Sequence, residues 1–303
     1  MQKKRDLITN VIFSVIFFVG LSVMLYPAFS NWWNQNMASH TVASYQEAVA
    51  QLDDGQTERL LNEARAYNAK LAGLTAPFLN FDSIPGYDEI LNISGTGIMG
   101  YVSIPNINVE LPIYHGTSEG VLQIASGHIQ GSSFPVGGSS THAVISGHRG
   151  LPSAKLFTDL DQIVEGDIFT VTILNEVLTY EVEKILIILP TETEKLAIVP
   201  GEDRVTLMTC TPYGVNTHRL LISGRRIETI YDKKIKVSAD ALQVDSMRVM
   251  PAVFFPLLGL LFIWWGITGK RRKNMHITKY TIRSIPPRQE DTKKGEQKHD
   301  ENS

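Results

Sequence analysis

Two uncharged apolar segments near the ends of the chain most constrain how it can fold. The first, residues 7–30, has no charged side chain and exceeds the roughly 20 residues that a helix needs to cross a bilayer. Basic residues at 3–5 precede it, no A-x-A cleavage pattern follows it, and Trp32 and Trp33 stand where an interfacial aromatic belt would lie. We therefore expect a retained membrane anchor rather than a cleaved signal peptide.

The second apolar segment, residues 249–269, ends at the basic run 270–273. Pro251 and Pro256 do not exclude a membrane helix, because membrane helices tolerate proline. Basic flanks mark the cytoplasmic side, so we expect a two-span protein of the cell membrane with both termini in the cytoplasm and residues 31–248 outside. A buried core helix is the alternative, and the abrupt basic border argues against it.

The charge distribution agrees with this topology. Residues 270–303 carry ten basic and five acidic side chains, and residues 1–6 have a net charge of +2, which leaves −10 for residues 7–269. An acidic outer domain is a poor match for nucleic acid, so we expect no nucleic-acid partner. The single cysteine, Cys210, permits no internal disulfide, and it is either a reactive thiol or a buried, inert one.

The residue composition and the apolar periodicity change along the outer part of the chain. Residues 38–73 have apolar spacings of three and four, which predict two helices, the second capped by Thr57. Residues 74–97 are interrupted by Pro and Gly and predict a loop. From Gly100 onward, seven or eight short β-branched segments predict a small closed β-barrel or a sandwich, with one short helix at 153–163.

The segment TLMTCTPYGVNTHRLLISGRR, residues 206–226, predicts a strand, a turn and a second strand, with Cys210 on the first and Arg219 on the second. A free thiol has a pKa of about 8.5, so a nearby cation or base is needed to make it reactive at neutral pH. Acyl transfer also needs donors for the oxyanion and an acid for the leaving group. Arg219 can donate but cannot be a base; a surface charge is its alternative role.

Several histidines compete for the acid–base role. Those in the predicted outer barrel are His115, His128, His142, His148 and His218. His148 lies in SGHRG, where a strand opens into a Gly-flanked loop, a frequent place for a catalytic side chain. Strand alternation directs His218 to the face opposite Arg219. These arguments favour His148, and a purely structural role is the alternative for each histidine.

These blocks resemble a known family. TLMTC followed by Arg219, with SGHRG upstream, resembles the sortases, the membrane-anchored cysteine transpeptidases of Gram-positive bacteria. GIMGYVSIPNINVELPIYHG and TCTPYGVNTHRLLISGRR are similar to the class C, pilus-polymerising subgroup, which also tends to have a second, C-terminal membrane helix. The resemblance covers roughly residues 40–230.

The resemblance implies a mostly β fold: an eight-stranded sortase-type barrel with N-terminal helices and a transmembrane helix at each end. Cys210 would attack the Thr–Gly bond of an LPXTG-like sorting signal and form a thioester. His148 would protonate the leaving amine and deprotonate the incoming one, and Arg219 would stabilise the signal and the oxyanion. The acceptor would be a lysine amine of another pilin. No cofactor and no metal are expected.

The expected organisation of the whole chain follows from these arguments. The segments are 1–6, cytoplasmic; 7–30, transmembrane helix; 31–97, extracellular helical region with a candidate lid at 74–97; 98–230, catalytic barrel; 231–248, linker; 249–269, transmembrane helix; and 270–303, basic, disordered cytoplasmic tail.

One departure from the subgroup concerns the lid. Class C enzymes usually carry Asp-Pro-aromatic in a loop over the active site, and this chain has Ala76-Pro77-Phe78. The anionic contact to the catalytic arginine would then be missing, leaving Phe78 as the plug, unless Asp82 replaces it. We expect such a lid to open more often. The alternative is that residues 74–97 are only a linker.

Three rival functions remain at this stage. A housekeeping sortase would use the same chemistry to anchor surface proteins to peptidoglycan, and the second membrane segment and the N-terminal extension count against it. A thiol hydrolase would resolve the thioester with water. A non-catalytic, membrane-tethered scaffold that binds pilins would not need Cys210, His148 and Arg219 together.

Overall fold

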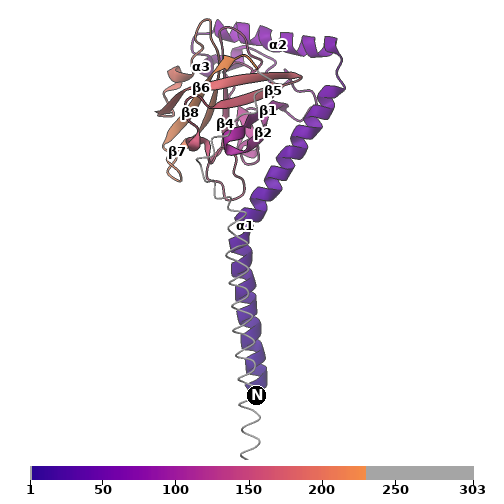
Figure 1. Cartoon of the computed structure of the whole chain (residues 1–303), viewed down its shortest axis with the longest axis vertical. Helices are drawn as coiled ribbons and strands as arrows, with labels where there is room; N and C mark the ends of the chain where they lie inside the picture. Colours follow the sequence, from indigo (N-terminus) through magenta and orange to yellow (C-terminus); the bar gives the residue numbers. More distant parts are fainter. Residues whose placement is uncertain (1, 230–303) are drawn as a thin grey trace, which may run out of the picture. The chain divides into compact units, whose positions relative to one another are not determined.

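The computed structural model describes residues 2–229 (Figure 1). The predicted linker at 231–248, the apolar segment 249–269 and the tail 270–303 lie outside the described residues. The helices are α1 (Gln2–Ala50), α2 (Asp54–Ala72), α3 (Pro77–Asn80) and α4 (Glu119–Leu122). The strands are β1 (Ile98–Ile104), β2 (Val109–His115), β3 (Ser126–His128), β4 (Thr141–Gly147), β5 (Ile168–Ile173), β6 (Glu176–Ile188), β7 (Asp203–Thr211) and β8 (His218–Ile227).

The strands close into a barrel in the order β1-β2-β3-β4-β7-β8-β6-β5 (Figure 1). The β2–β3 and β4–β7 pairs are parallel, and the other neighbours are antiparallel. Inward side chains such as Val102, Ile113, Ile145 and Val205 are fully buried, as period-2 alternation requires. The predicted barrel is confirmed, and a sandwich is excluded because every strand has two neighbours.

The predicted short helix at 153–163 is wrong. The structure has a single 3-10 turn there, Leu160–Gln162. Leu156 has a φ of +40°, which breaks a right-handed helix, and the Phe157 N–H donates to the carbonyl of His148 at 3.1 Å. That hydrogen bond joins the segment to the end of β4 instead of to its own preceding turn.

The predicted cap of the second helix is also wrong. Asp53, not Thr57, is the N-cap of α2: its carboxylate accepts from Gln56 N at 2.7 Å, and the Gln56 side chain accepts from Asp53 N at 3.0 Å. This reciprocal pair is a capping box, and a carboxylate near a helix N-terminus is also favoured by the helix dipole.

The helix α1 runs without a break from the predicted anchor into the first predicted outer helix. Within residues 2–229 it is the one helix long and apolar enough to cross a membrane. Its large apolar side chains are exposed, among them Phe13, Phe18 and Val23. An apolar surface of this length is compatible with a membrane anchor, because the hydrocarbon of a bilayer would cover it.

The outer half of α1 is fastened to the barrel by Tyr45. Its ring is 2% exposed, its hydroxyl donates to the carbonyl of Met99 at 2.8 Å, and it accepts from the N–H of Leu174 at 2.8 Å. Met99 lies in β1 and Leu174 directly follows β5, so one hydroxyl satisfies two backbone groups of neighbouring strands. Burial raises the pKa of Tyr45 strongly, which keeps the hydroxyl neutral.

We expect Tyr45→Phe to lower the free energy of unfolding by about 1–3 kcal/mol, because a buried N–H and a buried carbonyl both lose their partner. Urea unfolding of the detergent-solubilised full-length protein measures it. The matched control is Tyr101→Phe, which removes an exposed hydrogen bond from Gln46 at 3.0 Å and should change stability by less than about 0.5 kcal/mol. Equal effects of the two variants would contradict the role of Tyr45.

A buried aromatic group fastens the segment before β1 to the barrel. The rings of Tyr87, His128 and Phe134 stack with centroids 5.4–5.8 Å apart. His128 Nε2 lies 2.8 Å from the carbonyl of Ser133, which can only accept, so Nε2 carries the proton and Nδ1 accepts from the Tyr87 hydroxyl at 2.9 Å. Complete burial lowers the pKa of His128 to about 4.

We expect acid to destabilise the fold through His128. Its folded pKa is about 4 and its unfolded pKa about 6.5, so the unfolded chain binds more protons as the pH falls through this window. We expect the free energy of unfolding to fall by about 2 kcal/mol between pH 7 and pH 5 through this group. Urea unfolding at each pH would measure the change. His128→Gln should remove this share of the pH dependence, and an unchanged slope in that variant would contradict the assignment.

Candidate active site

Cys210 and Arg219 are directly opposite each other in the antiparallel β7–β8 pair. Side chains at opposed positions of neighbouring strands project from the same face with Cβ atoms about 4.5–5.5 Å apart. The thiol is free and half-buried. The sequence-based expectation that these two side chains face one site therefore agrees with the register of the two strands.

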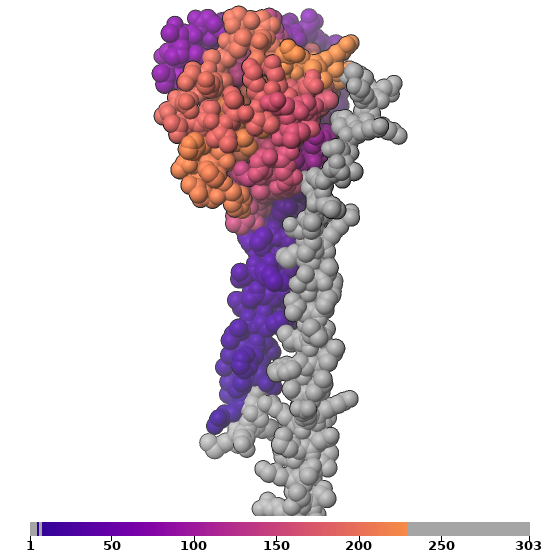
Figure 2. Space-filling view, turned by 60° about the vertical axis from the view of Figure 1, so that its left-hand side comes forward, coloured from indigo at the N-terminus to yellow at the C-terminus, as the bar shows by residue number. Residues whose placement is uncertain are grey.

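The alternation of β7 shows which face this is. Val205 and Leu207 are fully buried in the barrel interior, whereas Met208 and Cys210 lie on the outer face and are partly exposed. Figure 2 shows the orange part of the chain, which includes β7 and β8, at the surface of the molecule. On the outer face Met208 packs against a small apolar cluster, which we call the outer cluster: Val144, Ile188, Leu196 and Leu221.

His148 follows β4, the parallel neighbour of β7. The β4–β7 register ends at Ser146 opposite Met208, so continuing it by two residues brings His148 level with Cys210. The Thr209 hydroxyl donates to the carbonyl of Gly147 at 2.8 Å and so extends the contact between the two strands. The structure thus brings His148 to the same end of the sheet as the thiol.

An acidic side chain that the sequence did not single out lies beside His148. The Nε2 atom of His148 is 3.7 Å from Oε2 of Glu119, at the start of α4. A hydrogen bond from Gln123, above all, and then the neighbouring His148 lower the pKa of the Glu119 carboxyl. The Glu119–Gln123 spacing was visible in the sequence, but only the fold places it next to His148.

The other barrel histidines have different surroundings. His128 belongs to the buried aromatic stack, and His142 is buried with its ring nitrogens bonded to Ala197 O and Thr206 Oγ1. Burial lowers the pKa of both. His218 is next to Arg219 and bonds to Thr217. Among the five candidates His148 is the one that the strand register brings level with the thiol.

The guanidinium of Arg219 is folded toward the β7–β8 turn. Its Nη1 donates to the carbonyls of Asn216 at 3.2 Å and His218 at 3.1 Å. Within residues 2–229 it forms no ion pair, so no carboxylate competes for its remaining donors. A planar guanidinium with free donors is suited to a carbonyl oxygen or an oxyanion.

The candidate lid lies on the outer face. Ala76 has a φ of +52° and is the N-cap of α3, and the Phe78 ring packs against the outer cluster together with Ile129 and Met208. A Cβ on Gly131 would lie 2.9 Å from the Phe78 Cα, so the backbone of the candidate lid packs directly on the connection between β3 and β4. Asp82 forms no ion pair with Arg219 in the described part of the chain. Burial, above all, and then the charge of Asp82 raise the pKa of Tyr67.

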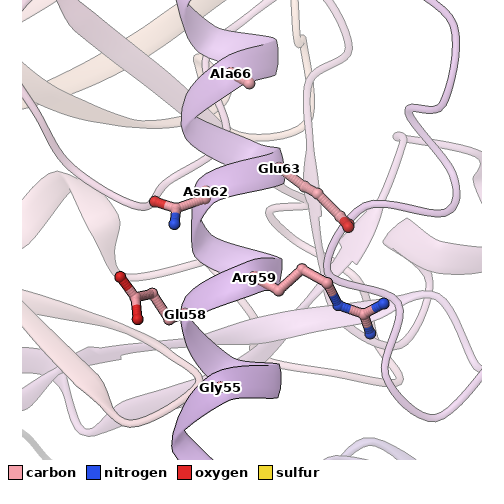
Figure 3. A pocket seen from close by; sticks show the side chains of 6 residues that line it. All are labelled: Gly55, Glu58, Arg59, Asn62, Glu63 and Ala66. Carbon is pink, nitrogen blue, oxygen red and sulfur yellow. The ribbon is translucent and has the colours of Figure 1, made fainter.

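No group of three or more His, Cys, Asp or Glu side chains within residues 2–229 could hold a metal ion. A hollow runs along α2, lined by Gly55, Glu58, Arg59, Asn62, Glu63 and Ala66 (Figure 3). All of its lining residues lie on α2, whereas Cys210 lies on β7, Arg219 lies on β8 and His148 follows β4. This hollow is therefore separate from the candidate active site.

The barrel places a thiol opposite a guanidinium on β7 and β8, and a histidine at the end of β4, the parallel neighbour of β7. This arrangement is that of an enzyme whose active site is centred on one cysteine. The sortase domain model matches residues 102–227. Sortase D of Bacillus subtilis is 30% identical over 131 residues, 42% of this chain and 63% of that protein, so the match spans less than two thirds of this curated relative.

Two solved structures are more similar. Sortase C1 of Streptococcus agalactiae is 46% identical with a TM-score of 0.57, covering 63% of this chain and 100% of that one. Sortase C of Streptococcus pneumoniae is 42% identical with a TM-score of 0.57, covering 63% of this chain and 97% of that one. The chain belongs to the sortase family of cysteine transpeptidases, and these neighbours are class C sortases.

We expect Phe78→Ala to speed alkylation of Cys210 by iodoacetamide roughly 3- to 10-fold, because it removes the ring that anchors the lid on the outer cluster. Ala76→Asp should slow alkylation, because a carboxylate there could pair with the unpaired Arg219. Cys210 is the one thiol of the chain, so intact mass reports it directly.

The matched control for the lid is Leu79→Ala, since Leu79 lies in the same short helix and is 83% exposed. It should leave the alkylation rate within about a factor of two. A Phe78→Ala variant with the rate of the unaltered protein would show that residues 74–97 are a linker and not a lid.

Proposed function

We propose that this chain is a membrane-anchored class C sortase that joins pilins. It would cleave an LPXTG-like sorting signal between Thr and Gly through a thioester on Cys210, and transfer the acyl group to a lysine amine of another pilin. The observation that carries this proposal is the register that sets Cys210 opposite Arg219 and level with His148.

Each side chain has a role that suits its chemistry. The Cys210 sulfur attacks the Thr carbonyl, the Thr–Gly C–N bond breaks, and the thiol proton passes through His148 to the leaving amine. The lysine amine then attacks the thioester, gives its proton to His148, and releases the thiol. Arg219 donates to the carbonyl oxygen as it becomes an oxyanion.

The outer cluster supports a sorting signal with apolar residues. Val144, Ile188 and Leu221 lie on the outer face of β4, β6 and β8, and Phe78 packs on them. The Leu and Pro of an LPXTG-like signal could replace the Phe78 ring on this surface, because apolar contact carries little directional preference. The Streptococcus pneumoniae neighbour is described in terms of its pilin substrate specificity, which supports pilins as substrates here.

The proposed attachment of this chain to the membrane supports a surface protein as its substrate. The apolar part of α1 continues into the outer half of the same helix, which Tyr45 fastens to the barrel, so the barrel would be held close to the bilayer. We propose that residues 7–30 and 249–269 both cross the membrane and that the barrel is extracellular. Substrates retained in the same membrane would then reach the thiol without diffusing away.

We expect a covalent adduct of the LPXT fragment on Cys210 when the protein is mixed with an LPXTG-type peptide, observed by intact mass. Cys210→Ala should show none, and Phe78→Ala should form the adduct faster. His148→Ala and Arg219→Ala should reduce the acylation rate about 100-fold or more.

A second step of the same experiment identifies the acceptor. Adding a lysine-containing pilin fragment should resolve the adduct into an isopeptide product, whereas a preference for a peptidoglycan cross-bridge peptide would indicate a housekeeping sortase. Release by water alone would indicate a hydrolase. No adduct with either lid variant, across several sorting motifs, would favour a non-catalytic scaffold.

A further inference from the structure

The segment that follows His148 is tied to the turn that follows Cys210, and the proposed roles of these residues do not use this connection. We propose that Arg149 is a positioning residue. Its side chain is held by Asp161 and contacts the ring of Tyr213, and this contact, which we call the clamp, sets the position of residues 148–150 relative to the turn between β7 and β8. This inference rests on the proposed function, and its test includes a readout that does not.

The guanidinium of Arg149 is fixed on one side by an ion pair. Its side chain is 10% exposed, and Nη2 donates to Oδ2 of Asp161, in the 3-10 turn Leu160–Gln162. Nε is buried and has no hydrogen-bond partner in the described part of the chain. A buried, charged side chain with a single anionic partner holds one orientation, because any rotation would leave the charge uncompensated.

On its other side the guanidinium faces an aromatic ring. The Cζ atom of Arg149 is 5.7 Å from the ring centroid of Tyr213, within the range of a cation–π contact. Tyr213 lies three residues after Cys210, in the turn between β7 and β8. The contact therefore joins the residue after His148 to the turn that follows β7, the strand that carries the thiol.

The same ring also rests on the backbone after Arg149. Gly150 has a φ of +78°, and a Cβ at that position would lie 3.0 Å from Cε2 and 3.1 Å from Cζ of Tyr213. Gly150 is thus required both by its backbone conformation and by the close ring. The rest of the Tyr213 side chain faces solvent, and the residue is 59% exposed.

The main chain around His148 is restrained at several other points. The His148 carbonyl accepts from Phe157 N at 3.1 Å, and the Gly150 N–H donates to Thr158 Oγ1 at 3.2 Å. These bonds fix the segment to residues 157–158, but none of them reaches the turn after Cys210. The Arg149–Tyr213 contact supplies that link, and small errors in the distance between a base and a nucleophile reduce rates strongly.

The first readout is kinetic and uses the full-length protein in detergent. Arg149→Met and Tyr213→Leu should each lower kcat for peptide cleavage about 10- to 100-fold with KM changed less than about threefold. The double variant should be no slower than the slower single variant, because both remove one contact. Tyr213→Phe keeps the ring and should retain at least half of kcat.

The second readout does not depend on activity. Hydrogen–deuterium exchange of the amides at 148–158 should be at least about tenfold faster in Arg149→Met and Tyr213→Leu, and unchanged in Tyr213→Phe. Val215→Ala, in the same turn and 65% exposed, is the matched control and should alter neither readout.

The outcomes separate the two proposals. Faster exchange without any peptide cleavage by the unaltered protein would support the clamp and refute the proposed function. Cleavage by the unaltered protein with additive losses in the double variant, or with unchanged exchange in Tyr213→Leu, would overturn the clamp. A loss of kcat in Tyr213→Phe equal to that in Tyr213→Leu would also overturn it.

Discussion

The register of β7 between its two neighbours is the constraint on which the site depends. Its antiparallel pairing with β8 sets Cys210 opposite Arg219, and its parallel pairing with β4 carries His148 to the same level. Because side chains alternate along a strand, a slip of one residue in either pairing would turn a candidate side chain to the other face. The buried interior residues Val205 and Leu207 prevent such a slip, since they would be moved out of the core.

The N-terminal helices contribute to the barrel through a few buried polar side chains. The Tyr45 hydroxyl satisfies backbone groups of β1 and of the residue after β5, and Asn68 of α2 exchanges two hydrogen bonds with the backbone of Phe134, at 2.9 and 2.7 Å. Buried polar groups without partners are destabilising, so these contacts define one docking position for each helix. The apolar α1 is thereby connected to the domain that carries the thiol.

The outer face near the thiol combines an apolar surface with a small number of polar groups. Phe78 occupies the outer cluster, while Arg219 has no carboxylate partner within residues 2–229. An apolar side chain without an ion pair is held mainly by hydrophobic burial, and in the proposed function a sorting signal with apolar residues would compete for the same surface. In the proposed lid, the absence of an acidic residue at position 76 would leave Arg219 without an ionic contact and make the lid easier to displace.

Features that depend on local periodicity could be predicted from the amino-acid sequence. These features include the uncharged run at 7–30 and the short alternating strands. The pairing of Cys210 with Arg219 could also be predicted, because a short loop between two antiparallel strands fixes which of their residues are opposite each other. The helix at 153–163 and the Thr57 cap were wrong, because a local pattern does not reveal the left-handed Leu156 or the stronger carboxylate cap at Asp53. The positions of Glu119 beside His148 and of Arg149 facing Tyr213 could not be predicted, because they depend on contacts between distant parts of the chain. These contacts join residues 29 and 64 positions apart. The β3–β4 pair brings α4, which precedes β3, to the end of β4, and the parallel β4–β7 pair brings the turn after β7 to the same end.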